Sequence, residues 1–473
     1  MIAHEIFLSS TFLVFSFSTV PEEIPCRSAH SEDIDWQKQA PALLRGELRG
    51  EGLTFSSFFF MCEVREKWEL WRGMTMSQAI RVGIVGSRYA AEFHYTAYQK
   101  VTGVPVRVVG ITSLTKEHRE KFAGERGIKA FHSIDEMFPE VDVIDVCTPG
   151  QVHESVSIAA FEAGKHVVVE KPFTGYYGPP GDETFRGNSF PKKRMLDEAV
   201  ASSKRIIAAA LRSGKKLCYA ENWVYAPAVQ KEAEILTKSR GQILWALGDQ
   251  SHSGSPSPAY GIWRLSGGGS VVGKSCHPLS ALLYLKGIEG MTHHGKAIRP
   301  KTVSARTHEI TRNPHFMNKG FLRTDYNDIE DYCQVHVTFD DGMVADVFAS
   351  EIVMGGVHNW IEIFANNHRT RCNLSPVNAM ELYNPREEQL ADVYIVEKIG
   401  TKQGWSTPAP DENFMFGYPQ EIQDFMEAIA TGREPKSGVL VASDTIAVLY
   451  AAYVSAELKG SEVDIPLDSG LGC

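Results

Sequence analysis

A glycine turn with the residue pattern for binding phosphate lies between an apolar strand and a helix at residues 83–94, GIVGSRYAAEFH. In such turns backbone N–H groups and the positive helix end face the anion, and glycines allow a tight turn and a close approach. The first glycine position is Gly86, the second is occupied by Arg88, and the third by the small residue Ala91. The guanidinium of Arg88 suits phosphate if it turns outward; the alternative is a surface arginine on an ordinary loop.

A lysine that could move a proton follows the apolar strand in VVVEKPF, residues 167–173. Glu170, Lys171 and Pro172 fall at the carboxyl edge of the predicted sheet, where open α/β sheets bind ligands. Lys171 could act as an acid or base on a substrate hydroxyl if burial or a neighbouring cation lowers its pKa. The alternative is a structural ion pair with a nearby carboxylate.

A histidine in the segment GGGSVVGKSCHPLS, residues 267–280, is a second candidate for proton transfer. Imidazole exchanges protons near neutral pH. From its own surroundings in the sequence, His277 fits equally a helix cap or a core position.

The elements that must position these groups alternate between strands and helices from Ile80 to about residue 218. Four apolar, β-branched runs are typical of strands covered on both faces in a parallel sheet, and Gly164 and Gly214 are suited to end helices. We therefore expect a doubly wound parallel sheet over residues 76–218. The runs are IRVGIVG, VRVVGIT, VDVIDVCTP and HVVVE.

A loop rich in glycine, proline and aromatic residues, 173–191, interrupts this alternation. It is longer than most connections, and long loops are often lids or binding loops.

The pattern changes to hairpins in the second half of the chain. Residues 333–351 have strand signals on both sides of the turn Asp341-Gly342, and residues 360–374 repeat this around Asn366-Asn367. Such turns indicate β-hairpins. We expect residues 219–473 to form an α+β domain with a mainly antiparallel sheet, ending in helices near 419–430 and 441–458.

The first 75 residues differ from both domains. Residues 7–20, FLSSTFLVFSFSTV, have the length of a signal peptide but lack a basic flank and a clear cleavage site. We interpret residues 1–75 as a non-native or disordered extension ahead of a start at Met74 or Met76. The alternative is an export or membrane-association segment.

Composition limits the partners and the compartment. The 473 residues, 43% hydrophobic, suit two domains, and a net charge of −10 provides no basic field for nucleic acid or anionic lipid. The eight cysteines form no CxxC pairs, which fits a reducing compartment. We expect a cytoplasmic protein that binds neither nucleic acid nor membranes.

Several motifs together resemble one family of oxidoreductases. The segments GIVGS…H, DVIDVCTPGQVH, GKHVVVEKPF, GGGSVVGKSCHPLS and YAAYVSAELKG look like the glucose-fructose oxidoreductase / inositol dehydrogenase / MocA (Gfo/Idh/MocA) family, from about Ile80 to Pro466. The resemblance implies a Rossmann domain followed by an α/β domain whose large open sheet covers the active site and often serves oligomerisation, here in a homodimer or homotetramer. It also implies hydride transfer between NAD or NADP and a carbinol carbon of a sugar, cyclitol or related polyol.

The same resemblance implies roles for individual residues. Lys171 looks like the family's lysine that hydrogen-bonds the reacting oxygen, and His277 like its proton-transfer histidine. The expected cofactor site comprises Gly83, Gly86, Ser87, Arg88, Tyr89, Ala90, Ser113, Lys116, Thr148, Pro149, His153, Glu170, Lys171 and Pro172. The expected substrate site comprises Glu221, Asn222, Trp223, Tyr225, His252, Tyr260, Trp263 and Arg264, whose aromatic members could instead be core residues.

Two departures from the family pattern affect the site. Many members have an aspartate four residues before the histidine, where this chain has Gly273; Glu221 and Asp249 are candidates to replace that carboxylate. NAD enzymes usually have an acid at the end of the second strand, whereas Thr112, Ser113 and Lys116 stand here, which favours NADP. His252, His277 and Glu221 have no metal-ligand spacing, and we expect no metal.

Two other functions remain open from the sequence. One is glycoside cleavage through transient oxidation by a tightly bound NAD. The other is a catalytically silent sensor or scaffold, which the changes at Arg88 and Gly273 would permit. Retention of both Lys171 and His277 argues against the silent protein.

Overall fold

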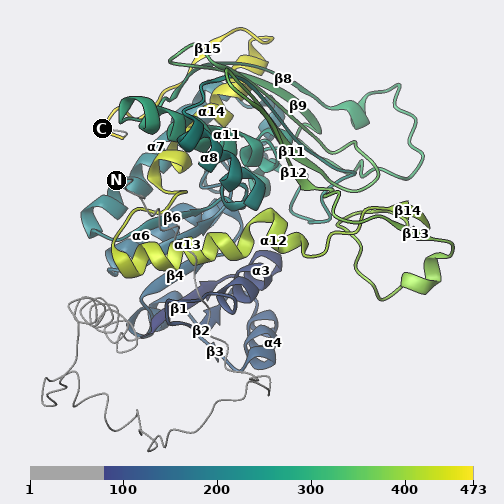
Figure 1. Ribbon diagram of the computed structural model, residues 1–473. Coiled ribbons are helices and arrows are strands. Elements are labelled where there is room, and N and C mark those ends of the chain that lie inside the picture. Colours follow the sequence, from purple (N-terminus) through teal and green to yellow (C-terminus); the bar gives the residue numbers. More distant parts are fainter. Residues whose placement is uncertain (1–78, 472–473) are drawn as a thin grey trace, which may run out of the picture. The chain divides into compact units, whose positions relative to one another are not determined.

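The computed structural model describes residues 79–471 (Figure 1). The expectation for residues 1–75 lies outside this range. Within it, the chain contains a parallel sheet, a larger mixed sheet and a two-stranded ribbon.

The parallel sheet has six strands in the order β3-β2-β1-β4-β5-β6, which is the Rossmann order. All of its strand pairs are parallel, and the apolar runs are buried because helices cover both faces. This confirms the predicted doubly wound sheet. Its strands are β1 (Ile80–Val85), β2 (Val106–Thr112), β3 (Lys129–Ala130), β4 (Val143–Val146), β5 (His166–Glu170) and β6 (Leu217–Ala220).

The helices that connect these strands end where the glycines indicate. Gly164 and Gly214 both have positive φ, 71° and 66°, and follow the last turns of α6 and α7. The first helix begins at Tyr89, directly after the glycine turn, and ends at Tyr98. The helices are α3 (Tyr89–Tyr98), α4 (Lys116–Arg126), α5 (Ile134–Met137), α6 (His153–Glu162) and α7 (Lys192–Ser213).

The second sheet has seven strands in the order β12-β11-β7-β10-β9-β8-β15. The hairpins β9/β10 and β11/β12 confirm the two predicted turns, and only the β7/β10 pair is parallel. The strands are β7 (Ile243–Ser251), β8 (Pro300–His308), β9 (Tyr332–Phe339), β10 (Val344–Ser350), β11 (His358–Ala365), β12 (Arg369–Ser375) and β15 (Val463–Asp464). The separate ribbon pairs β13 (Leu382–Asn384) with β14 (Gly404–Ser406).

Helices from the second half pack on both sheets. The helix α14 contacts α7 and β6 of the first sheet and β8 of the second, and α13 contacts α3. Among the described residues α14 is the one helix long and apolar enough to cross a membrane, but 83% of that stretch is buried inside the protein. The helices are α8 (Pro227–Ser239), α9 (Trp263–Ser266), α10 (Ser270–Gly273), α11 (Cys276–His294), α12 (Glu412–Phe416), α13 (Tyr418–Thr431) and α14 (Val439–Glu457).

The boundary between the two halves is less sharp than expected. The strand β6 crosses residue 218 and ends at Ala220, so the carboxyl edge of the first sheet leads directly into the second half. The last two long helices return to the first sheet. The two halves therefore share a continuous packed core.

The long loop 173–191 is fixed against the second half of the chain. The indole N–H of Trp263 donates to the Tyr176 carbonyl at 3.0 Å, and Asp328 accepts from the Gly187 N–H at 2.7 Å. Tyr176 also packs between two phenylalanines of the loop. In this structure the loop is a packed part of the core, not a lid.

The close approach of Gly187 to Trp263 yields a first prediction. A Cβ at residue 187 would lie 2.0 Å from the indole ring, so Gly187→Ala should lower the free energy of unfolding by about 1–3 kcal/mol through overpacking. Denaturant unfolding followed by circular dichroism measures this. The control Gly124→Ala, inside α4 with nothing within 4 Å, should be neutral or stabilise by up to ~1 kcal/mol. Equal stability of the two variants would contradict the packing described.

Candidate active site

The glycine turn after β1 is pressed against the end of β4. Gly86 has φ 117°, and a Cβ there would lie 2.2 Å from the Cys147 carbonyl oxygen. Its N–H donates to the Thr112 carbonyl at 2.8 Å. Only glycine fits this position, and the turn exposes the amino end of α3, where Tyr89 and Ala90 form the first turn.

A cavity of about 380 Å³ lies beside this turn and is lined by Ser87, Arg88, Glu92, His118, Lys121, Phe122 and Glu125. Arg88 is exposed and precedes α3 in an extended conformation without capping it. The hydroxyls of Ser87 and Ser113 are 2.9 Å apart and join the ends of β1 and β2. Lys116 lies outside the cavity lining and is 3.8 Å from Glu120. The open helix end and the two cationic side chains on the wall fit the phosphates and ribose of a dinucleotide.

His153 joins the ends of β4 and β5. Its Nδ1 lies 2.9 Å from the Pro172 carbonyl oxygen and its Nε2 2.9 Å from that of Thr148. Burial lowers the pKa of His153, so the neutral ring donates to one carbonyl at a time. His153 thus holds Thr148, Pro149 and Pro172 at one edge of the sheet, while its own ring nitrogens face the backbone.

A buried histidine that sequence reasoning did not select lies beneath Lys171. His94 Nδ1 is 2.9 Å from Asp145 Oδ2, and its Nε2 is 3.3 Å from Glu170 Oε1. Burial alone would lower the pKa of His94, but Asp145 and Cys147 raise it well above its usual value. The other oxygen of Glu170 accepts the Lys171 backbone N–H at 2.8 Å. The only sequence feature that could have identified His94 is its place at the end of the glycine-turn motif.

Lys171 differs from the expectation in its protonation. Burial lowers its pKa, but the net shift is upward because Cys276, Glu170, Glu221 and Glu397 lie nearby. The Cys276 thiol is itself kept neutral by burial, which raises its pKa, so the carboxylates are the lasting charges. The condition for a neutral lysine, a lowered pKa, is therefore not met, and Lys171 is a charged hydrogen-bond donor.

His277 is paired with one of the two predicted replacement carboxylates. Its Nδ1 is 2.5 Å from Glu221 Oε1, and the Trp223 ring stacks on the imidazole with centroids 5.8 Å apart. Burial lowers the pKa of His277, Glu221 raises it and Lys171 lowers it further, so that the net shift is downward. The ring is neutral near pH 7, with Nδ1 held by Glu221 and Nε2 left to exchange a proton. The other candidate, Asp249, accepts from the Ser251 hydroxyl at 2.6 Å.

The structure shows why the family's aspartate position is glycine here. A Cβ on Gly273 would lie 2.6 Å from the Tyr260 ring and 2.9 Å from its hydroxyl oxygen. Tyr260 therefore fills the space of a side chain at residue 273. Burial keeps the phenol neutral by raising its pKa well above the usual value. The carboxylate that contacts the imidazole comes instead from Glu221, at the end of β6.

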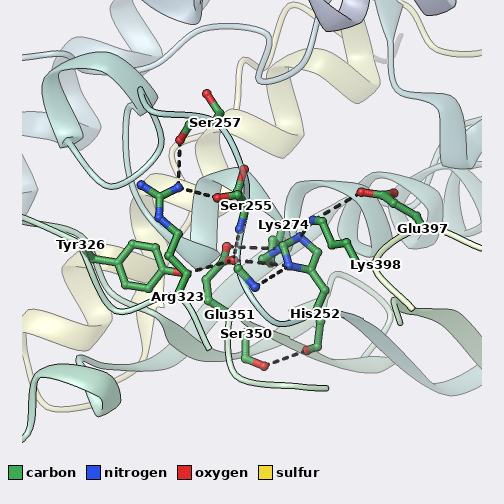
Figure 2. A network of polar contacts seen from close by, with 12 residues as sticks. His252, Ser255, Ser257, Lys274, Arg323, Tyr326, Ser350, Glu351, Glu397 and Lys398 are labelled. Carbon is green, nitrogen blue, oxygen red and sulfur yellow. Dashed lines mark hydrogen bonds and ion pairs between the residues drawn. The ribbon is translucent and has the colours of Figure 1, made fainter. Parts of the chain in front are cut away.

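A polar cluster of His252, Lys274, Glu351 and Lys398 lies next to this site (Figure 2). Lys398 Nζ is 2.7 Å from His252 Nε2, Lys274 contacts the same nitrogen, and Lys274 Nζ is 3.2 Å from Glu351 Oε1. The Gly254 N–H lies 3.0 Å from His252 Nδ1. If Nδ1 accepts that hydrogen bond, the proton on Nε2 needs an acceptor, and an uncharged lysine amine provides one.

Burial and the neighbouring positive charges lower the pKa values of His252 and Lys274 in this cluster. Burial, with Lys398 nearby, lowers the pKa of Lys274 to about 8 although Glu351 opposes the shift. Burial and the charges of Lys274, Lys398 and Lys171 lower the pKa of His252. The sequence places Lys274 beside Gly273 but does not show its contact with Glu351, nor that of Lys398 with His252, because these partners lie far apart along the chain.

Four expected substrate residues are placed away from the reacting groups. Trp263 is buried and bonded to the Tyr176 carbonyl, and Tyr225 donates to Asp424 at 3.0 Å. Asn222 donates to the Phe416 carbonyl at 2.8 Å, and Arg264 is 3.7 Å from Glu183 of the long loop. Trp263, Tyr225 and Asn222 are thus bound within the core, Arg264 is partly exposed, and a substrate role for these four stays a prediction. The other four are Glu221, Trp223, His252 and Tyr260.

Two groups of side chains in the described residues have atoms close enough to share an ion. They are His94, Asp145 and Cys147, and Glu221, Cys276 and His277. In both groups the histidine is hydrogen-bonded to the carboxylate, and burial raises the pKa of both thiols. The hydrogen bonds account for both arrangements, and a metal-free site stays a prediction.

The six-stranded sheet and its glycine turn define the class of protein: a protein with a nucleotide-binding Rossmann domain. Residues 80–178 match the family described as "Oxidoreductase family, NAD-binding Rossmann fold", and residues 241–465 match its "C-terminal alpha/beta domain". The chain belongs to the Gfo/Idh/MocA family, as the sequence motifs indicated.

Several proteins of known name are similar to this chain. Levoglucosan dehydrogenase of Pseudarthrobacter phenanthrenivorans is 24% identical over 421 residues, which cover 82% of this chain and 99% of that protein. UDP-N-acetylglucosamine 3-dehydrogenase of Acidithiobacillus ferrooxidans is 32% identical over 95 residues, only 20% of this chain and 29% of that protein.

Solved structures share the fold over most of the chain. GenD2 from gentamicin A biosynthesis, in complex with NAD, has a TM-score of 0.65 at 20% identity and covers 82% of this chain and 97% of its own. The myo-inositol 2-dehydrogenase of Lactobacillus plantarum has a TM-score of 0.60 at 17% identity and covers 82% of this chain and 100% of its own. These similarities confirm a Rossmann domain followed by a domain with an open, mainly antiparallel sheet.

The Glu221–His277 contact yields a prediction that needs no substrate. In Glu221→Gln the carboxylate charge that raises the pKa of His277 is lost, while burial and Lys171 still lower it, so the pKa should fall further. NMR titration of histidine-labelled protein measures the change.

A second glutamate–histidine pair, Glu232 and His368, provides a matched control. Glu232 is also buried and lies 2.8 Å from His368 Nε2, so Glu232→Gln removes a similar pair and should leave the His277 titration unchanged. An unchanged or raised His277 pKa in Glu221→Gln would contradict the assigned pair.

Proposed function

We propose that this protein oxidises a carbinol carbon of a sugar, cyclitol or related polyol with NAD or NADP, or reduces the corresponding carbonyl. The observation that carries the proposal is the combination, beside a dinucleotide turn, of a protonated Lys171 and a neutral His277 backed by Glu221. Names of the relatives support the substrate class, since one is a levoglucosan dehydrogenase and another a UDP-N-acetylglucosamine 3-dehydrogenase.

The residues divide the proton chemistry between them. Lys171 donates a hydrogen bond to the substrate oxygen and stabilises the negative charge that develops as the O–H bond breaks. His277 Nε2 takes the hydroxyl proton, and Glu221 stabilises the imidazolium that forms. Bound nicotinamide would supply the hydride acceptor or donor. In the reverse direction, His277 returns the proton to the oxygen of the new carbinol.

The cofactor preference that we propose is NADP. The strand β2 ends at Thr112, is followed by Ser113 and has no acid at this point, so the usual partner of a ribose diol is missing. The cavity next to Ser113 is lined by Lys121 and Arg88, whose charges favour a ribose phosphate, although Glu92 and Glu125 also line it.

The remaining parts of the proposal concern organisation and location. Residues 76–218 would bind the dinucleotide, and 219–473 would bind the substrate and form a homodimer or homotetramer. Leu244 and Trp245 on β7 are exposed large apolar residues that suit such contacts. The five described cysteines are free and buried, which supports a cytoplasmic location.

Replacing Lys171 tests the proposed reaction. In Lys171→Met the charged donor is lost, and turnover of a polyol substrate should fall by about 10²–10⁴-fold. Nucleotide affinity should change little because the glycine turn is intact. Reduced-nicotinamide absorbance gives the rate, and calorimetry gives the affinity.

The control for this variant lies at the other end of the same strand. Lys165 precedes β5, whereas Lys171 follows it, so Lys165→Met should retain turnover. A Lys171→Met enzyme with near-normal rates would remove Lys171 from the mechanism.

A further inference from the structure

A second cavity lies outside the reacting site, beside an arm of the chain. Residues 376–411, between β12 and α12, project from the seven-stranded sheet and carry the β13/β14 ribbon (Figure 1). The cavity next to this arm has a volume of about 450 Å³, within the range of about 300–1,000 Å³ usual for small-molecule sites. Neither the expected cofactor site nor the expected substrate site includes it.

The lining combines an aromatic face with hydrogen-bonding groups. Trp405 on β14 is 75% exposed and lies opposite Tyr383 on β13, with ring centroids 5.4 Å apart. Glu381, Gln403 and Thr407 also line the cavity, as does Ser406, whose buried hydroxyl has no partner within residues 79–471. An exposed indole beside carboxylate, amide and hydroxyl groups suits a ligand with one apolar face and a ring of hydroxyls.

The charge of the lining further limits the chemical class of ligand that the cavity can bind. None of its twelve residues is Lys, Arg or His, and Glu381 is acidic. A phosphate or a nucleotide diphosphate needs cationic partners or a helix end, and a carboxylate ligand would face Glu381 without compensation. An uncharged pyranose ring needs no cationic partner and is not repelled by Glu381.

Two short segments carry both lining residues of this cavity and residues that contact His252. Val396 and Ile399 line the cavity, and Lys398, which lies between them in the sequence, contacts His252 (Figure 2). On the second wall, Gly355 and Gly356 follow Val353, whose N–H donates to the His252 carbonyl at 3.1 Å. Lys171 is near enough for its charge to lower the pKa of both His252 and Lys398.

We propose that this cavity is a second sugar subsite, which binds an uncharged pyranose unit linked by a glycosidic bond to the unit that reacts at Lys171 and His277. The inference rests on the proposed function for the reacting unit. It makes a disaccharide or glycoside, and not a free monosaccharide, the preferred substrate.

Calorimetric titration of the full chain with glucose and with maltose, cellobiose and gentiobiose tests the subsite. We expect at least one disaccharide to bind about tenfold or more tightly than glucose. In Trp405→Ala that advantage should disappear, while glucose binding stays unchanged. Glu381→Ala, just before β13, should reduce the same advantage.

The matched control is Phe321→Ala, which removes another large aromatic side chain, 74% exposed, that does not line this cavity. It should leave disaccharide binding unchanged. No disaccharide advantage in the parent protein, or the same advantage in folded Trp405→Ala, would overturn the subsite.

Turnover separates failure of the subsite from failure of the redox proposal. Trp405-dependent binding without oxidation of any sugar would leave the subsite in place and defeat the proposed reaction. Oxidation that requires Lys171 but is unchanged in Trp405→Ala would support the proposed reaction and defeat the subsite.

Discussion

The hydrogen bond between Glu221 and His277 joins the two halves of the protein at the site. Glu221 directly follows the last strand of the parallel sheet, and His277 opens the first long helix of the second half. Both side chains are buried, and a hydrogen bond to a charged group contributes about 1.5–3 kcal/mol. The contact therefore fixes the imidazole relative to the sheet edge that carries Lys171. Trp223 stacks on the ring and limits its rotation.

A second buried contact sets the charge at the edge of the sheet. His94, held between Asp145 and Glu170, places a positive group under the Glu170 carboxylate and keeps that carboxylate ionised by lowering its pKa, against the effect of burial. Glu170 in turn stabilises the charge of Lys171. The protonation state of Lys171 therefore depends on charged side chains at the ends of several strands.

Local patterns were sufficient to predict the two sheets and the position of Lys171. Buried parallel strands leave apolar runs, and Asp341-Gly342 allows few turns other than a hairpin. Glu221 could be proposed because it ends an apolar strand. The direction of the Lys171 pKa shift could not be predicted from the sequence, because it depends on Glu221 and Glu397, which are distant from Lys171 along the chain. Two other features could not be predicted either, because they result from tertiary packing: Tyr260 fills the space next to Gly273, and Trp263 is buried.

The central claim is that the turn at Gly86, with Arg88 at its second position, binds a nicotinamide dinucleotide. Calorimetric titration of the full chain with NAD, NADH, NADP and NADPH tests it most directly. The structure predicts binding of one redox pair at one site per chain, with NADP(H) favoured and affinity reduced in Arg88→Gly. Folded protein that binds none of the four, and releases no nucleotide when denatured, would contradict the claim.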